Sequence, residues 1–423
     1  MLSGKPSKSY FQSEIRAQSR SIERRLREGG AWSQALVMPE GQYFCYCFYG
    51  YTLLNRLASG ENEAPGLNDI EAIIAKVEEF KSAFPFDWCK DIDPAGGVIC
   101  LGHANYLRAG YATLGGSKPE IIEAYHEQSG RLAEAFTKSS NGFIESFPGY
   151  WWPVDNYPAI ESLRLHDRLY ETDFFSSTSR ARVSLESTLD EKSSLMVAQF
   201  DASGKAIDVP RGCALSMSLA FRPGLVDRFS RQQYREFSRQ LMIPVLNMVG
   251  IREWLPGDTS SFKVGPVVFD IGAAASGLGI AATRANLDYV SWIRLIRGME
   301  AIGLPCWTAS GEKHYFGQSF LLGDILALWG KTICVWDEPE PYASFVQSGK
   351  PVYDSPVLLL SLAVVLAFAI LALISMVFLK ILAREMSEIS KPGRFLMILR
   401  VVAVLLTLAY FILPQLLWLQ SSL

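Results

Sequence analysis

The chain has 423 residues, of which 49% are hydrophobic and 20% charged, and its formal net charge at pH 7 is −3. This balance provides no basic footprint, so nucleic acid is excluded as an expected partner. The seven cysteines are scattered without a CxxC pair or nearby histidines, so the sequence predicts no metal site.

The first 30 residues are rich in Arg and Lys and contain no apolar stretch, so they do not form a visible secretory signal. We expect this basic N-terminal segment, 1–30, to be a solvated amphipathic helix. Residues 31–350 are expected to form the main domain.

Helical spacing dominates residues 31–350. A helix is predicted over 41–58, a second is capped by Asn68 or Asp69, and Pro119 and Pro158 each fit the first turn of another. Further helices are expected from about Ala214, over 231–249 and over 275–302. Residues 195–200 and 206–209 read instead as a short β-hairpin. The paired succession of ten to twelve helices predicts an all-α fold, an (α/α)6 six-hairpin toroid with a small β-hairpin insertion and a pocket built from loops at one end.

Two apolar runs at the C-terminal end, 356–379 and 395–419, are each long enough to cross a bilayer as a helix. A short basic loop joins them, so they are predicted to form a transmembrane hairpin with Trp418 as an interfacial anchor. The protein is therefore expected to be a multi-pass membrane protein with the lipid bilayer as a partner.

The orientation of the hairpin is left open by the sequence. The basic loop favours a cytoplasmic position, which would place the large domain outside the cell. Export of that domain would need a signal, and the first 30 residues show none. Either the domain is cytoplasmic and the loop breaks the rule, or an upstream segment is missing from the sequence.

The loop before Pro158 carries the strongest chemical signal. Glu145 and Asp155 are two carboxylates on a stretch packed with aromatic residues, and such a pair can work as acid and base. Tyr150, Trp151, Trp152 and Asn156 are the candidate binding residues of the same loop. The structural alternative is that both Trp residues plug the core and that Asp155 caps a helix.

Three further sites are candidates. His103 could transfer a proton, or it could be a buried or capping histidine. Arg211 with Cys213, and Arg252 with Glu253, could anchor a polar substrate or could form structural ion pairs.

The order of these motifs resembles the linalool dehydratase/isomerase domain family, from about Met38 to Leu295. In chain order, the shared features are the Pro-then-aromatic helix near 39–54, the Asp93-Pro94 turn, Gly102-His103-x-Asn105, Gly115-Gly116-Ser117, the aromatic loop ending at Asn156, the helix at 165–169 followed by Asp173, the Ser203-Gly204 hairpin, the Arg252-Glu253 pair and the Gly-rich opening of the last long helix.

The resemblance implies a toroid that forms a homopentameric ring and removes or shifts a hydroxyl group without a metal or organic cofactor. His103 matches the active-site histidine of the family. Glu145 and Asp155 stand where the family has two cysteines, and Cys213 stands where it has a tyrosine. The Asp and Tyr that a neighbouring subunit supplies have no counterpart among the first 30 residues.

Three hypotheses follow. The first is a membrane-anchored acid–base lyase or isomerase that acts on a hydroxylated small molecule, such as an isoprenoid, through Glu145, Asp155 and His103. The second is a carbohydrate-active hydrolase or lyase that uses Glu145 and Asp155, with Trp151 and Trp152 as a stacking platform. The third is a non-catalytic binding or assembly module.

Overall fold

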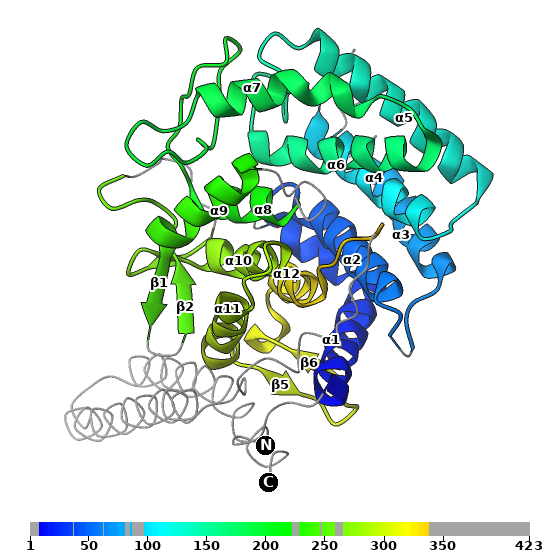
Figure 1. Ribbon diagram of the computed structural model, residues 1–423. Coiled ribbons are helices and arrows are strands. Elements are labelled where there is room, and N and C mark those ends of the chain that lie inside the picture. Colours follow the sequence, from blue (N-terminus) through cyan, green and yellow to red (C-terminus); the bar gives the residue numbers. More distant parts are fainter. Residues whose placement is uncertain are drawn as a thin grey trace, which may run out of the picture.

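The computed structural model describes residues 8–36, 38–61, 63–80, 85–86, 97–221, 228–245, 248–258 and 265–337. Within these ranges the chain is mostly helical (Figure 1). The helices are α1 (Lys8–Arg27), η1 (Gly30–Leu36), α2 (Gly41–Ala58), α3 (Leu67–Glu79), α4 (Val98–Thr113), α5 (Pro119–Lys138), α6 (Pro153–Tyr170), η4 (Phe175–Thr178), α7 (Ser179–Ser187), α8 (Gly212–Ala220), α9 (Arg228–Leu241), α10 (Ala273–Ala285), α11 (Tyr289–Ile302), η5 (Phe316–Gln318) and α12 (Leu321–Thr332).

The even-numbered helices form a closed ring. In the order α2, α4, α6, α8, α10 and α12 each helix contacts the next, and α12 contacts α2 again. The odd-numbered helices lie outside them: α1 against α12, α3 and α5 against α4, α9 against α8 and α11 against α10, with α7 further out against α5 (Figure 1). This arrangement confirms the predicted helical toroid for the described part of the chain.

The inner helices run parallel. Asn105 of α4 donates from Nδ2 to Ser162 Oγ of α6 at 2.9 Å, and the two residues lie at similar depths in their helices. A Cβ placed on Gly212 at the start of α8 would lie 3.1 Å from Ala275 at the start of α10. Tyr43 near the start of α2 donates to Cys100 O near the start of α4 at 2.6 Å, and Asn55 Nδ2 and Thr332 Oγ1 near the ends of α2 and α12 lie 3.4 Å apart. The first turns of the inner helices therefore share one end, which we call the N-terminal end of the ring.

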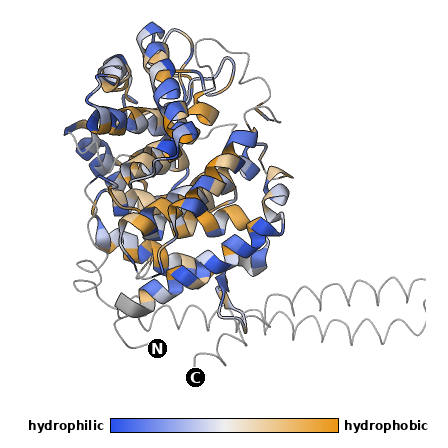
Figure 2. Ribbon diagram, turned by 90° about the vertical axis from the view of Figure 1, so that its right-hand side faces the viewer, coloured by the Kyte–Doolittle hydropathy of each residue, from blue (hydrophilic) through white to orange (hydrophobic). Residues whose placement is uncertain are grey.

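Aromatic side chains fill the centre of the ring. Phe48 packs edge-on against Trp329 with ring centroids 4.8 Å apart, and Tyr106 stacks on Trp336 at 4.4 Å. Gly110 allows this approach, because a Cβ there would lie 2.7 Å from the Trp336 ring. The interior helices are accordingly more hydrophobic than the outer ones (Figure 2).

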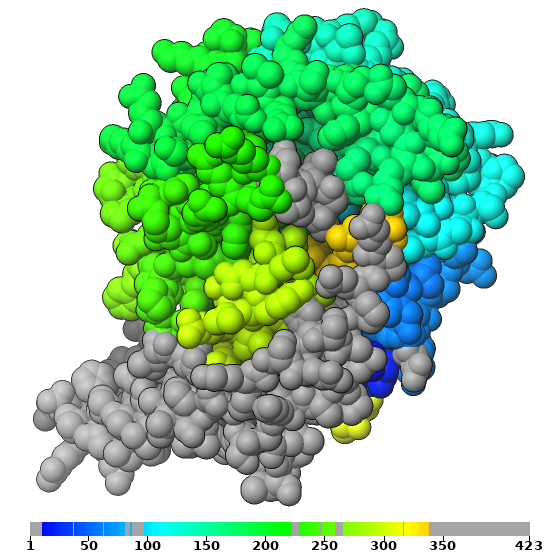
Figure 3. All heavy atoms as spheres, in the orientation of Figure 1, coloured from blue at the N-terminus to red at the C-terminus, as the bar shows by residue number. Residues whose placement is uncertain are grey.

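The described chain leaves the ring at the end opposite to the first turns. Asp337, five residues after α12, lies 2.9 Å from Arg164 Nη1 and 2.9 Å from Arg168 Nη1, both near the end of α6. On the face seen in Figure 3, the last described residues, coloured orange, reach the surface near its centre.

Besides the helices, the described residues form three two-stranded antiparallel sheets. Strand β1 (Met242–Val245) pairs with β2 (Met248–Ile251), β3 (Val267–Val268) with β4 (Ile271–Gly272), and β5 (Cys306–Trp307) with β6 (Lys313–His314). The predicted hairpin around 201–205 is present as a turn, in which Asp201 N donates to Lys205 O at 2.9 Å. Its pairing is limited to isolated bridges such as Phe200 with Ala206.

Three helix boundaries differ from the prediction. Helix α6 begins at Pro153, because Pro153 fits its first turn, and Pro158 lies inside it. Helix α9 ends at Leu241, where β1 begins, instead of continuing to 249. The long helix predicted over 275–302 is two helices. Leu287 between them has φ +59°, and Asp288 starts α11 by accepting a bond from Ser291 N at 3.0 Å.

The N-terminal segment is helical, as predicted, but α1 is not a solvated arm. Phe11, Ile15 and Ile22 are buried, and the same face of the helix contributes buried Glu14 and Gln18. Helix α1 is therefore part of the outer layer that packs against α12 and β6.

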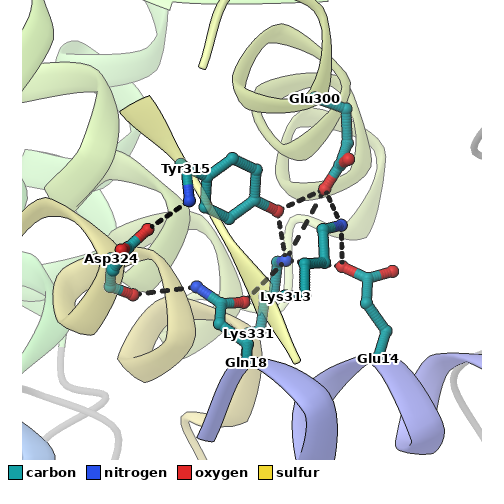
Figure 4. A network of polar contacts seen from close by, with 7 residues as sticks. All are labelled: Glu14, Gln18, Glu300, Lys313, Tyr315, Asp324 and Lys331. Atoms are coloured by element: carbon teal, nitrogen blue, oxygen red, sulfur yellow. Dashed lines mark hydrogen bonds and ion pairs between the residues drawn. The ribbon is translucent and has the colours of Figure 1, made fainter. Parts of the chain in front are cut away.

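A buried network of ionic contacts joins α1 to the ring (Figure 4). Lys331 Nζ of α12 lies 2.6 Å from Glu14 Oε1, 3.1 Å from Gln18 Oε1 and 2.8 Å from the Tyr315 hydroxyl. Lys313 Nζ of β6 lies 2.9 Å from Glu14 Oε1 and 2.7 Å from Glu300 Oε1 of α11. We call these six residues the lysine network.

None of the helices in the described ranges has the length and apolar composition to cross a membrane. The predicted transmembrane runs, 356–379 and 395–419, lie outside the described residues, as does the Asp93-Pro94 turn.

Candidate functional site

The N-terminal end of the ring gathers most of the residues that the sequence singled out. Asp155 lies in the first turn of α6, and Arg211 and Cys213 flank the start of α8. Glu253 joins them, because its backbone oxygen accepts a bond from Gly212 N at 2.8 Å. Glu145 reaches the same end through the first turn of α4.

Asn156 fixes the loop that carries both predicted carboxylates. Its Oδ1 accepts from Ile144 N at 2.9 Å, and its Nδ2 donates to Ile144 O at 3.1 Å and to Trp152 O at 3.2 Å. The neighbouring Glu145 carbonyl accepts bonds from Gly97 N and Val98 N at the start of α4. The side chain of Asn156 is therefore used to hold this loop in place, and its predicted contact with a substrate stays a prediction.

Asp155 is buried and its Oδ2 has no hydrogen-bond partner among the described residues. Burial raises the pKa of its carboxyl group to about 7, a hydrogen bond from Ser146 opposes that rise, and the nearby Glu40 carboxylate adds to it. Such a group is partly protonated at neutral pH. It is therefore able to donate a proton to a bound molecule and to take one back.

Glu40 is a site residue that sequence reasoning missed. It precedes α2, is half-buried, and lies close enough to Asp155 for their charges to repel. Burial raises the pKa of Glu40 as well. Its position next to Pro39 at a helix start was visible in the sequence, but its proximity to Asp155 depends on α2 and α6 flanking α4 in the ring.

Glu145 has different surroundings from Asp155. Its side chain is half-buried, and Oε2 accepts a bond from Gly149 N at 3.1 Å within its own loop. The two carboxylates thus differ in solvent access although they belong to one loop. This difference is what an acid–base pair requires.

Aromatic rings flank this loop. Tyr150 is 49% exposed, and its ring centroid lies 5.7 Å from that of Trp152. Trp152 also contacts Phe147 at 5.8 Å. Trp151 is half-buried, and its carbonyl accepts a bond from Phe200 N at 3.0 Å, so its backbone anchors the loop to the 200–206 turn.

His103 is fully buried in the aromatic interior. Its Nδ1 lies 2.8 Å from the Tyr51 hydroxyl, and its ring contacts Tyr43, Phe44 and Phe48. Burial lowers its pKa to about 3, so the imidazole is neutral at physiological pH. Its Nε2 has no hydrogen-bond partner in the described ranges. The surroundings are those of a core histidine with one free acceptor or donor position.

Arg211, Cys213 and Glu253 form one buried cluster. Glu253 Oε1 accepts from Arg211 Nη2 at 2.9 Å and from Cys213 Sγ at 3.0 Å. Burial raises the pKa of Glu253 in spite of the bonds from Arg211 and Cys213, and burial also raises the pKa of the Cys213 thiol. Glu253 Oε2 and Trp254 Nε1 have no partner among the residues that the structure describes.

Arg252 is separate from this cluster. Its Nη1 lies 2.6 Å from Asp270 Oδ2, in an ion pair on the surface. The predicted Arg252-Glu253 pair thus divides into a surface residue and a buried one. Within the described ranges, no group of three His, Cys, Asp or Glu side chains is arranged to hold a metal ion.

The comparisons with known proteins identify no family. No protein-family profile matches the sequence, and no curated protein sequence matches it. Similar solved structures include Dfg5 from Chaetomium thermophilum in complex with glucosamine, at 10% identity and a TM-score of 0.49, covering 84% of this chain and 95% of that one. A GH76 α-mannanase from Bacteroides thetaiotaomicron matches at 8% identity and a TM-score of 0.45, covering 68% of this chain and 84% of that one. Because both TM-scores lie below 0.5, the fold and site of this chain are assigned from its own contacts.

Proposed function

We propose that this protein is an acid–base enzyme that acts on a carbohydrate at the N-terminal end of the ring. The observation that carries the proposal is Asp155, a buried carboxyl group with a pKa of about 7 and an Oδ2 atom free of partners among the described residues. Most buried polar atoms are hydrogen-bonded, so such an atom at a helix start suits a ligand contact.

Glycosidic bond cleavage needs one carboxylic acid and one carboxylate. In the proposed reaction Asp155 donates its proton to the leaving oxygen as the glycosidic C–O bond breaks. Glu145 receives a proton from the attacking water, whose oxygen forms the new bond to carbon. Burial, helped by the negative charge of the nearby Glu40, raises the pKa of Asp155 and so keeps it partly protonated at neutral pH. The exposed ring of Tyr150 and the neighbouring Trp152 provide faces on which a sugar ring can stack.

A second candidate is the lyase or isomerase that acts on a hydroxylated isoprenoid. The aromatic shell around His103 and its free Nε2 favour it, because an isoprenoid needs apolar walls. Asp155 would protonate the departing hydroxyl group, and His103 would accept a proton from carbon. No cofactor is part of either proposal, and the homo-oligomer that the family resemblance implies remains a prediction.

Attachment to a membrane is a further part of the proposal, supported by the two apolar runs, 356–379 and 395–419. Extraction of cell membranes with alkaline carbonate tests it. An integral hairpin remains in the pellet, whereas release of the full-length protein into the supernatant would contradict the attachment.

The test of function compares the wild type with Asp155→Asn and Glu145→Gln, with Glu134→Gln on outer helix α5 as the matched surface control. The detergent-solubilised proteins are examined by mass spectrometry for retained ligand and then assayed on glycans and on hydroxylated isoprenoids. We expect the wild type and Glu134→Gln to turn over a glycan, and both site variants to lose at least about 10²-fold in turnover.

The outcomes separate the candidates. Turnover of a hydroxylated isoprenoid, lost also in His103→Gln, would replace the carbohydrate proposal by the lyase or isomerase. Full activity in both site variants would show that the site is assigned wrongly. Binding of a ligand without turnover in the wild type would indicate a non-catalytic module.

A further inference from the structure

Exposed aromatic side chains are concentrated at the end of the ring that carries the candidate site. Among the described residues, the exposed large aromatic side chains are Trp32, Tyr150, Phe269 and Phe320, at 63%, 49%, 92% and 37% exposure. Trp32 lies in η1 before α2, Tyr150 lies before α6, Phe269 lies before α10, and Phe320 directly precedes α12. Each therefore stands beside the first turn of an inner helix.

The most exposed of the four is held in a fixed position. Phe269 occupies the tip of the β3–β4 hairpin with φ +49°, and Asp270 follows it with φ +66°. Residues other than glycine rarely adopt this left-handed region, and they do so at a cost in free energy. Arg252 Nη1 lies 2.6 Å from Asp270 Oδ2, and Glu253 N donates to Asp270 O at 3.0 Å. The projecting ring is thus fastened to the segment that supplies Glu253 to the candidate site.

The opposite end of the ring has a different surface. Its exposed large apolar side chains in the described ranges are aliphatic, namely Leu169 at the end of α6 and Leu287 and Val290 at the α10–α11 turn. Next to Leu169, the half-exposed Arg168 pairs with Asp337, a largely buried carboxylate that also pairs with Arg164. Aromatic exposure is therefore a property of one end.

We propose that this end docks on the surface of a lipid bilayer through an apolar rim. The rim consists of the four aromatic residues and two aliphatic neighbours on the same segments: Trp32, Leu36, Tyr150, Val268, Phe269 and Phe320. Trp, Tyr and Phe rings partition favourably into the region between lipid headgroups and acyl chains. Leu36 and Val268, at 73% and 60% exposure, add aliphatic surface that stacking on a sugar does not require.

The length of the chain beyond residue 337 is compatible with this orientation. Residues 338–355 precede the first apolar run and can span at most about 60 Å. An inner helix such as α2, with 18 residues, is about 27 Å long. The connection is long enough to place either end of the ring against the bilayer, and the apolar rim favours the N-terminal end.

The proposal extends the proposed function, on which it rests, because the candidate site then faces the membrane surface. A substrate approaching it would be a hydroxylated or glycosylated molecule carried on a lipid. The docking is nevertheless testable without knowledge of the substrate.

The experiment uses the full chain in nanodiscs of phosphatidylcholine and phosphatidylglycerol. The photoreactive residue p-benzoylphenylalanine replaces Phe269 or Trp32 in the test variants, and Val183 on α7 or Val290 on α11 in the controls. Val183 and Val290 are 63% and 62% exposed, matched to Trp32 at 63%. After irradiation, lipid adducts are quantified by mass spectrometry. We expect the two rim positions to give at least about fivefold more lipid adduct than either control.

Each result bears on the proposal. Equal lipid adduct at rim and control positions, or lipid adduct at Val290 alone, would overturn it. Adducts between two copies of the chain at Phe269 would assign the rim to an interface between subunits instead. If the protein does not enter nanodiscs, the membrane attachment fails and the docking fails with it. Loss of turnover in Asp155→Asn is measured separately and tests the enzyme proposal alone.

Discussion

Two groups of buried polar residues, the lysine network and the candidate site, differ in whether their buried polar atoms all have partners. In the lysine network two ammonium groups, two carboxylates, an amide and a phenol satisfy one another, and none of its side-chain atoms is among the buried atoms left without a partner in the described ranges. At the candidate site Asp155, Glu253 and His103 each keep one such free atom. We expect the completed cluster to stabilise the fold, and we propose that the free atoms of the candidate site contact a ligand.

The largest expected effect is on the lysine network. Lys331→Met removes one charge and leaves Glu14 buried next to a single lysine. We expect the free energy of unfolding to fall by about 3–5 kcal/mol, because breaking a buried ion pair leaves an uncompensated charge. Denaturant unfolding monitored by circular dichroism measures it.

The matched control is Lys76→Met, which breaks the exposed Lys76–Glu79 pair, and it should change the free energy of unfolding far less than Lys331→Met does, because water screens exposed pairs. Adding Glu14→Gln to Lys331→Met should recover part of the loss, since the unbalanced carboxylate is then gone. Equal losses in Lys331→Met and Lys76→Met would show that the network is not a stabilising element.

At the candidate site, replacing a buried ionisable group should stabilise the protein at alkaline pH, whereas replacing Lys331 should destabilise it. The pKa of Asp155 is about 7 in the folded protein and 3.8 as its reference value, so the folded state holds a proton that the unfolded state has lost between these pH values. The contribution of Asp155 to stability therefore falls as pH rises from about 4 to about 7, by up to about 4 kcal/mol. Asp155→Asn should remove this part of the slope and be more stable than the wild type at pH 8.

Unfolding titrations at pH 5 and pH 8 check this prediction, with Glu134→Gln as an exposed control that should leave the slope unchanged. A variant that is less stable than the wild type at pH 8 would place Asp155 among the stabilising residues and weaken its role as an acid.

Lowering the pH should affect the lysine network in the opposite direction from the candidate site. Burial raises the pKa of Glu14, but the ammonium groups of Lys313 and Lys331 more than offset it, and the result is a pKa of about 2 against a reference value of 4.5. The contribution of Glu14 is thus complete above about pH 4.5 and is lost as pH falls toward 2, a change of about 3 kcal/mol. The stability difference between the wild type and Glu14→Gln should shrink over that range. A constant difference down to pH 3 would contradict the lowered pKa.

The helices were predictable where a local signal marks them. The limits of α2 and the start of α5 at Pro119 follow from an apolar run and a proline in the first turn. The break between α10 and α11 was missed because it depends on the left-handed backbone of Leu287 inside an apolar pattern.

The residues of the candidate site likewise include some that the sequence could predict and some that it could not. Glu145 and Asp155 were predictable because they lie ten residues apart in a single aromatic loop. Glu40 was not predictable, since only the packing of α2 and α6 on either side of α4 brings it close to Asp155. The Lys331 contact with Glu14 joins residues 317 positions apart, and two isolated charges carry no local sign of that partnership.

The smallest expected effect tests whether the aromatic loop serves the site. Tyr150 is half exposed, so Tyr150→Ala should change the free energy of unfolding by no more than about 0.5 kcal/mol. If its ring stacks on the substrate, the loss of that contact should cost about 0.5–1.5 kcal/mol of binding, or a rise in KM of about 2- to 12-fold with kcat unchanged. Tyr150→Phe keeps the ring and should keep the KM of the wild type. Glu14→Gln changes the lysine network and Lys76→Met changes an exposed ion pair, and neither residue belongs to the candidate site, so both variants should leave KM unaltered. A KM that rises equally in Tyr150→Ala and Glu14→Gln would mean that KM follows the stability of the fold and not a contact with Tyr150. The assignment of a functional role to the candidate site, in contrast to the lysine network, would then lose its support.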